Sequence, residues 1–198
     1  YAWRERFHEE TTTANVSTSV NATQRIVVEN ESVYRRNTSG MAVQIDDQQR
    51  TPIGFSEYAD GNVRFRSWFE PDDDGRDFRR YPDPENHASF ASFPADAITR
   101  YLSLESASVS RVAVDGSERQ HYLVRGTNVT HDAVTDVENY RARAVIRSDG
   151  FVRSLNVSYE TSYDGRTVSV HYRFSYRQVG TATVTPPPWL SSARATFE

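Results

Sequence analysis

Two long runs of alternating residues, joined by an Asp-Gly pair, constrain the fold of this chain more than any other feature. In residues 151–163 the apolar side chains Leu155, Val157 and Tyr159 share one parity, and in residues 167–177 Tyr172 and Phe174 do the same. Successive side chains of a strand point to opposite faces. An Asp-Gly pair between such runs is a strong hairpin signal. The sequence therefore predicts a long hairpin with one apolar and one polar face.

The same device recurs along the chain. Asp-Gly pairs also stand at 60–61, 115–116 and 149–150, and each predicts a tight turn. Further strands are predicted over residues 1–8, 10–21, 24–34, 40–45, 51–58, 62–69, 109–114, 120–124 and 139–147. After the last strand, residues 186–188 are all proline and predict an extended exit, anchored by Trp189 and Leu190. Many long strands with one apolar face predict an α+β, mostly β fold with a large, curved antiparallel sheet.

One amphipathic helix is predicted over residues 94–105, on the concave side of this sheet. Ser92 is a suitable cap and Pro94 suits a first turn, while Ile98, Tyr101 and Leu102 recur at helical spacing. Two interpretations stay open: simple core packing, or a helix that partly plugs a concave sheet. The preceding residues 70–92, rich in proline and acid, predict a long loop within a single domain of residues 1–198. Its segment 72–77 lacks the ligand spacing of a calcium loop.

No catalytic constellation is present. The chain has no cysteine, which excludes disulfides and thiolate chemistry, and its five histidines stand at no metal-ligand spacing. There is no Gly-rich phosphate loop and no nucleophile elbow. We therefore expect no enzyme activity, no cofactor and no metal. A net charge of −4 argues against nucleic acid as a partner.

Two compositional biases indicate an environment outside the cytoplasm. Every one of the 23 basic residues is arginine, which we interpret as adaptation to high salt, with biased codon usage as the alternative. Six sequons of the form N-x-[ST] predict glycosylation at an extracytoplasmic surface; their asparagines are Asn15, Asn21, Asn30, Asn37, Asn128 and Asn156. The alternative is that Asn, Ser and Thr are simply common on exposed strands. The opening residues have no apolar leader and no apolar run is long enough to span a membrane, so we expect a mature form or a fragment.

Rows of arginine alternate with the apolar residues of the last strands. Their members are Arg141, Arg143, Arg147, Arg173 and Arg177. Such rows can recognise an anionic headgroup or glycan, but more often they pair with Asp and Glu across a solvated sheet face. We favour the second interpretation.

The apolar face offers more aromatic surface than one short helix can cover. Loops cover the rest, or a second protein chain does, or a cavity remains that a lipid-like molecule fills. The candidate ligand-binding residues are Phe65, Ile98, Tyr101, Leu102, Phe151, Leu155, Tyr159, Tyr172 and Phe174.

Several segments resemble one family. The opening YAWRERF, the turn EYADGNVRFR, the segment ITRYLS and above all residues 139–189 are similar to haloarchaeal surface lipoproteins of uncharacterised function. The resemblance implies a fold like the LolA-type lipoprotein carriers, which hold acyl chains in a half-barrel. It also implies a lipid anchor on an upstream cysteine, so membrane attachment would require an anchor outside this chain. It carries over no catalytic residue.

Two functions are therefore expected. The first is a non-catalytic protein of the cell surface or secreted space that binds a lipid or other apolar molecule in a half-barrel. The alternative is a structural component of the cell envelope, such as a glycosylated filament or surface-layer subunit, that self-associates or binds envelope proteins.

Overall fold

A computed structural model describes residues 1–12, 17–44, 49–68, 77–82, 88–132, 134–163 and 165–198, which form eleven strands and two helices. The elements in chain order are β1 Ala2–Thr12, β2 Ser17–Val28, β3 Val33–Gln44, β4 Gln49–Asp60, β5 Arg64–Trp68, β6 Phe78–Tyr81, α1 Ala88–Leu102, β7 Ser108–Val112, β8 His121–Gly126, β9 Val137–Arg147, β10 Val152–Tyr163, β11 Arg166–Arg177 and α2 Leu190–Phe197.

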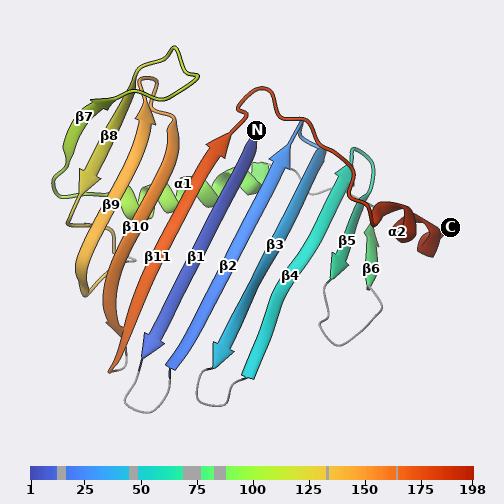
Figure 1. Cartoon of the computed structure of the whole chain (residues 1–198), viewed down its shortest axis with the longest axis horizontal. Helices are drawn as coiled ribbons and strands as arrows, with labels where there is room; N and C mark the ends of the chain where they lie inside the picture. Colours follow the sequence, from blue (N-terminus) through green and yellow to red (C-terminus); the bar gives the residue numbers. More distant parts are fainter. Residues whose placement is uncertain (13–16, 45–48, 69–76, 83–87, 133, 164) are drawn as a thin grey trace.

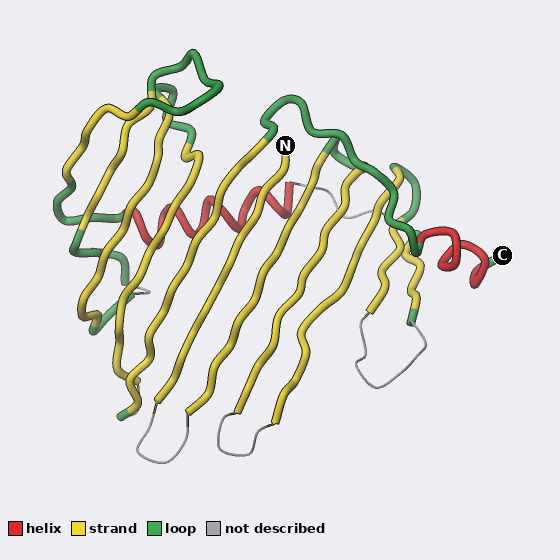
Figure 2. Tube along the Cα trace, viewed as in Figure 1, coloured by secondary structure: helices red, strands yellow, loops and turns green. Residues whose placement is uncertain are grey.

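All eleven strands belong to one antiparallel sheet. Its order is β6-β5-β4-β3-β2-β1-β11-β10-β9-β8-β7, so two meanders meet where β1 pairs with β11 (Figure 1). The sheet curves but does not close (Figure 2). The predicted fold class, a mostly β chain with an open, half-barrel-like antiparallel sheet, is confirmed.

The hairpin predicted from the alternation is formed by β10 and β11. Leu155 lies opposite Phe174 and Val157 opposite Tyr172, and all four side chains are buried. Gly165, in the turn between them, has φ of 71°. This left-handed conformation is one that glycine adopts without steric cost, so Gly165 suits the turn that the alternation predicted.

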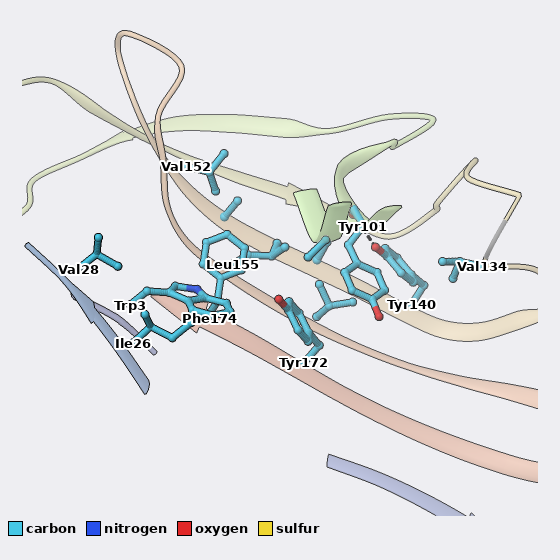
Figure 3. Packing of buried hydrophobic residues seen from close by; sticks show 14 of the residues in the cluster. Trp3, Ile26, Val28, Tyr101, Val134, Tyr140, Val152, Leu155, Tyr172 and Phe174 are labelled. Atoms are coloured by element: carbon cyan, nitrogen blue, oxygen red, sulfur yellow. Dashed lines mark hydrogen bonds between the residues drawn. The ribbon is translucent and has the colours of Figure 1, made fainter. Parts of the chain in front are cut away.

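The two faces of the sheet carry different helices. We call them the α1 face and the α2 face after the helix that packs against each. Because side chains alternate, Tyr172 and Phe174 lie on the α1 face, whereas His171 and Arg173 lie on the α2 face. The larger core lies between α1 and the sheet; Figure 3 shows Tyr101 of α1 above Tyr140 and Tyr172.

A smaller core lies on the α2 face, beneath the C-terminal segment. After β11 the chain crosses the upper ends of the neighbouring strands and enters α2 beside β5 and β6 (Figure 1). The ring of Trp189 stacks on Phe78 at 6.0 Å, and its Nε1 donates a hydrogen bond to Ser56 Oγ at 3.0 Å. Trp189 and Leu190 are buried, as expected for an anchor, but the short helix that follows was not predicted.

The helix differs from its predicted bounds. It begins at Ala88 instead of residue 94, so Pro94 lies inside it rather than in its first turn. It ends at Leu102 because Leu104 pairs with Val129 as an isolated β-bridge. The side chain of Leu104 then covers Gly126, where an added Cβ would lie only 2.5 Å from the nearest Leu104 methyl. The predicted loop 70–92 therefore contains the first residues of α1, and also the short edge strand β6.

Two strand boundaries were also wrong. The predicted strand 24–34 spans a turn, because Asn30 Oδ1 accepts hydrogen bonds from the backbone N–H groups of Ser32 and Val33. An Asx turn of this kind needs no Asp-Gly pair, so the alternation seemed unbroken. The predicted strand 10–21 likewise joins the end of β1 to the start of β2, and residues 13–16 lie outside the described residues.

Candidate functional site

A groove lies between α1 and strands β1, β2 and β3. It encloses about 410 Å³, within the range of about 300–1,000 Å³ that is common for small-molecule sites. We call it the α1 groove. The described side chains that define its walls are Glu5, Phe7, Ala22, Gln24, Arg36, Thr38, Asp96, Ala97, Arg100, Tyr101 and Tyr172.

Strand register explains why these residues meet. Phe7 lies opposite Tyr172 across the β1–β11 pair and opposite Ala22 across the β1–β2 pair. Gln24 lies opposite both Glu5 and Thr38. One parity of each strand therefore faces α1, and side chains of that parity line the groove.

One wall of the α1 groove is aromatic. The Tyr101 ring lies 5.2 Å from Tyr172 and 6.2 Å from Tyr159, and the Tyr140 hydroxyl donates a 2.6 Å hydrogen bond to the Tyr101 carbonyl (Figure 3). Burial raises the pKa of Tyr140, Tyr159 and Tyr172 above the ordinary value of 10.0. All three hydroxyls stay protonated at neutral pH, and Tyr172, which lines the groove, is therefore uncharged there.

The facing wall is polar. Arg36 donates from Nε and Nη2 to Gln24 Oε1, at 3.0 and 2.8 Å, and Thr38 Oγ1 donates to the same oxygen at 3.3 Å. Burial raises the pKa of Glu5, whereas the Tyr172 hydroxyl and the Arg36 guanidinium oppose that shift. The buried Tyr172 hydroxyl lies beside this carboxylate, yet it makes no well-formed hydrogen bond among the described residues.

The formal charges around the α1 groove balance. Arg36 and Arg100 face Glu5 and Asp96, so the lining has no net charge when all four are ionised. Such a lining gives no strong preference for an anionic or a cationic ligand.

Beyond Arg36, the α1 face carries a buried ionic cluster. The fully buried Glu57 accepts from Arg64 Nη1 at 3.1 Å, from Arg66 Nη2 at 2.5 Å and from the Tyr34 hydroxyl at 3.1 Å. The guanidinium of Arg66 lies 4.5 Å from the ring centroid of Phe55, and that of Arg36 lies 4.9 Å from the same ring. The carboxylate of Glu57 is paired with both guanidinium groups, and that of Arg66 also lies against an aromatic ring, so we interpret this cluster as structural.

The predicted ligand-binding residues do not all meet. Tyr101 and Tyr172 line the α1 groove, while Leu155, Tyr159, Phe174, Ile98 and Leu102 pack in the core behind it. Phe151 lies beside the same core, with its ring 5.1 Å from that of Tyr176.

Phe65 is on the opposite side of the sheet. It belongs to the smaller core with Trp189 and Leu190. Arg66 lies opposite Glu57 on the α1 face, and because side chains alternate, its neighbour Phe65 lies on the α2 face. Placing Phe65 with the α1-face residues was therefore wrong. The polar residues Glu5, Gln24 and Arg36 were missed, since nothing in the sequence shows which strands lie beside β1.

The sequon asparagines are mostly at the surface. Asn21, Asn30, Asn128 and Asn156 are exposed, whereas Asn37 is half-buried and accepts a 2.7 Å hydrogen bond from Ser56 Oγ. Asn15 lies outside the described residues. A glycan can extend from the first four positions without displacing protein.

Histidines meet at one place. His8 and His171 stack across the β1–β11 pair on the α2 face, with ring centroids 6.0 Å apart. Among the described residues, no three His, Asp or Glu side chains come together in a way that could hold a metal ion. Neither described helix has the length and apolar character needed to cross a membrane.

No protein-family model matches the chain, and no curated protein matches it.

Proposed function

We propose that this chain is a non-catalytic binding protein that holds a lipid-like or other apolar molecule in the α1 groove. The observation that supports this most is the groove itself, about 410 Å³ of open space against the aromatic wall of Phe7, Tyr101 and Tyr172. Apolar walls with a few placed polar groups are typical of small-molecule sites.

The two unlike walls favour an amphiphile. An alkyl or ring moiety would lie against the aromatic wall, and a polar group would reach Gln24, Arg36 and the Tyr172 hydroxyl. Because the charges of the lining balance, an uncharged or zwitterionic polar group fits better than a fatty-acid carboxylate.

The described lining offers little for catalysis. It contains no histidine, and burial raises the pKa of the Tyr172 hydroxyl, which keeps its proton in place. A binding role accounts for these residues without a reaction step.

We place the protein outside the cytoplasm, at the cell surface or secreted. The support for this is the set of exposed sequon asparagines at Asn21, Asn30, Asn128 and Asn156. Mass spectrometry of protein purified from its native source checks this, and the absence of glycans at all four asparagines would count against it.

Binding can be tested with a substitution that fills the groove. The probe is dodecylphosphocholine, a zwitterionic amphiphile, titrated below its micelle concentration by isothermal titration calorimetry. Ala22→Phe places a ring in the groove, and Asn21→Phe places the same ring on the other face of the same strand. We expect Ala22→Phe to weaken binding about tenfold or more while Asn21→Phe binds as the unaltered protein does.

Thermal unfolding of both variants shows that each is folded. Failure of the unaltered protein to bind, or equal binding by both variants, would remove the α1 groove as the site.

An envelope-assembly role is the second candidate, and one observation favours it. The sheet is open, so β6 and β7 are edge strands, and Val109 of β7 is 62% exposed. Exposed edges pair readily with strands of other chains. Sedimentation velocity over a range of protein concentrations tests this: a monomer throughout contradicts it, and association that Val109→Arg abolishes supports it.

A further inference from the structure

The α2 face carries a recess that is separate from the α1 groove. Two adjoining hollows, of about 520 and 280 Å³, lie over β1, β2, β3 and the end of β11. Both are lined by Arg25, Asn37 and Gln178. Arg4 and Arg177 line the larger one, and Arg35 lines the smaller. We call this combined space the arginine hollow.

Strand register brings like charges together here. Arg4 lies directly opposite Arg25 across the β1–β2 pair, and one step further along β1 Arg6 lies opposite Arg173 of β11. Like charges at directly opposed positions destabilise a strand pair. The register therefore creates a local excess of positive charge that an anion would relieve.

No described carboxylate neutralises these arginines. Arg147 pairs at 2.7 Å with Asp149, two residues further along the chain in the turn after β9, whereas Arg4, Arg25, Arg35 and Arg177 form no ion pair with any described residue. The ion pair of Arg147 is therefore local and not the cross-strand pairing that was expected of the arginine rows.

Arg35 gives an independent indication. Its Nε is buried without a hydrogen-bond partner among the described residues. Burial, together with the charge of Arg25, lowers the pKa of Arg35. A buried guanidinium N–H without an acceptor costs free energy, and a bound acceptor would recover that cost.

The rest of the lining is neutral and polar. Asn37, Ser39, Ser175 and Thr183 line the two hollows. The Oε2 of the nearby Glu29 accepts the Val184 N–H at 2.9 Å, which fixes the C-terminal segment beside the hollow. The recess between that segment and the strands suits a small group rather than a flat surface.

We propose that the arginine hollow is a second binding site, distinct from the α1 groove, that takes a phosphate or sulfate group of a small soluble ligand. Arginine presents its N–H donors in a planar fork that matches the oxygens of such groups. Arg4, Arg25, Arg35 and Arg177 line the hollow. Asn37, Ser39 and Thr183 supply neutral polar groups around it.

The probe is inorganic pyrophosphate, measured by isothermal titration calorimetry with sodium chloride at fixed ionic strength as the reference. Arg25→Gln removes a charge shared by both hollows, and Arg111→Gln removes the same charge from the exposed edge strand β7. We expect Arg25→Gln to weaken pyrophosphate binding at least about tenfold. Arg111→Gln should bind as the unaltered protein does, and the affinity should fall as salt is raised.

Three results would overturn the proposal: no pyrophosphate binding by the unaltered protein, equal losses in both variants, or binding only to phosphatidylglycerol vesicles. Arg25→Gln removes a repulsion with Arg4, so we expect it to fold, and its thermal unfolding checks this. The Ala22→Phe variant separates the two sites, because it should retain pyrophosphate binding whether or not the α1 groove binds an amphiphile.

Discussion

The α1 face has an aromatic half and an ionic half, and their buried side chains are shielded from water in different ways. Over β9, β10 and β11 the face is aromatic and α1 lies across it, whereas over β4 and β5 the face carries Glu57, Arg64 and Arg66 and no described helix covers it (Figure 1). The first half excludes water with a helix. The second half buries a carboxylate by surrounding it with guanidinium groups and rings.

The difference explains where the α1 groove lies. Tyr172 belongs to the aromatic half, and Arg36, which stacks on Phe55, is the first residue of the ionic half. The groove is therefore the boundary between the two halves, and its unlike walls follow from that position.

The largest expected effect is in the ionic half. Glu57→Gln leaves two largely buried guanidinium groups without their counter-charge, and breaking a buried pair of this kind typically costs about 3–5 kcal/mol. The measurement is urea unfolding at neutral pH. Glu105→Gln, an exposed carboxylate that accepts from Asn128, is the matched control and should change stability by less than about 0.5 kcal/mol.

A second variant sharpens this result. If the cost comes from the uncompensated cation, Arg66→Met in the Glu57→Gln background should recover part of it, because the two substitutions are coupled. Losses that add independently would show instead that Glu57 matters only through packing.

The comparison also shows how far the sequence could be interpreted. Alternation and Asp-Gly turns predict the β10–β11 hairpin and the apolar parity of each strand, since both depend on neighbouring residues alone. They cannot predict which side chains of β5 lie on the α1 face and which on the α2 face. Phe65 was predicted on the apolar face, which leaves its neighbours Arg64 and Arg66 on the opposite face. Their burial depends on Glu57, which the register places opposite Arg66.

The candidate site was harder to predict for the same reason. Tyr101 and Tyr172 could be predicted because apolar periodicity marks them. Gln24 and Arg36 could not, because the groove needs β1 to lie between β11 and β2, a long-range pairing that no local pattern encodes.

A smaller effect is expected in the aromatic half. Tyr140→Phe removes the 2.6 Å hydrogen bond to the Tyr101 carbonyl and leaves this buried acceptor near the end of α1 unsatisfied. We expect a loss of about 1–2 kcal/mol in urea unfolding. Tyr122→Phe, on the neighbouring strand β8, deletes a hydroxyl from a half-buried tyrosine and is the control. A loss no larger than that of the control would mean that ring packing alone holds α1 on the sheet.

The smallest effect is expected at the boundary, and it depends on pH. Burial raises the pKa of Glu5 above its ordinary value of 4.5, against the opposing influence of Arg36 and Tyr172. Well below pH 4.5 the carboxyl is protonated in both the folded and the unfolded chain. As the pH rises through the raised folded pKa, the unfolded chain has already released its proton, so stability falls.

Glu5→Gln removes that loss, so the variant should gain stability relative to the unaltered protein as the pH increases above 4.5. Thermal unfolding followed across this interval measures the gain. The charged and titratable groups that face Glu5 are Arg36 of β3, Tyr172 of β11, and Asp96 and Arg100 of α1, and all are kept. Glu10→Gln removes a carboxylate from the exposed side of the same strand and controls for net charge. Parallel pH profiles for Glu5→Gln and Glu10→Gln would show that the boundary is as well solvated as the open surface, and the contrast between the two halves would then not extend to the α1 groove.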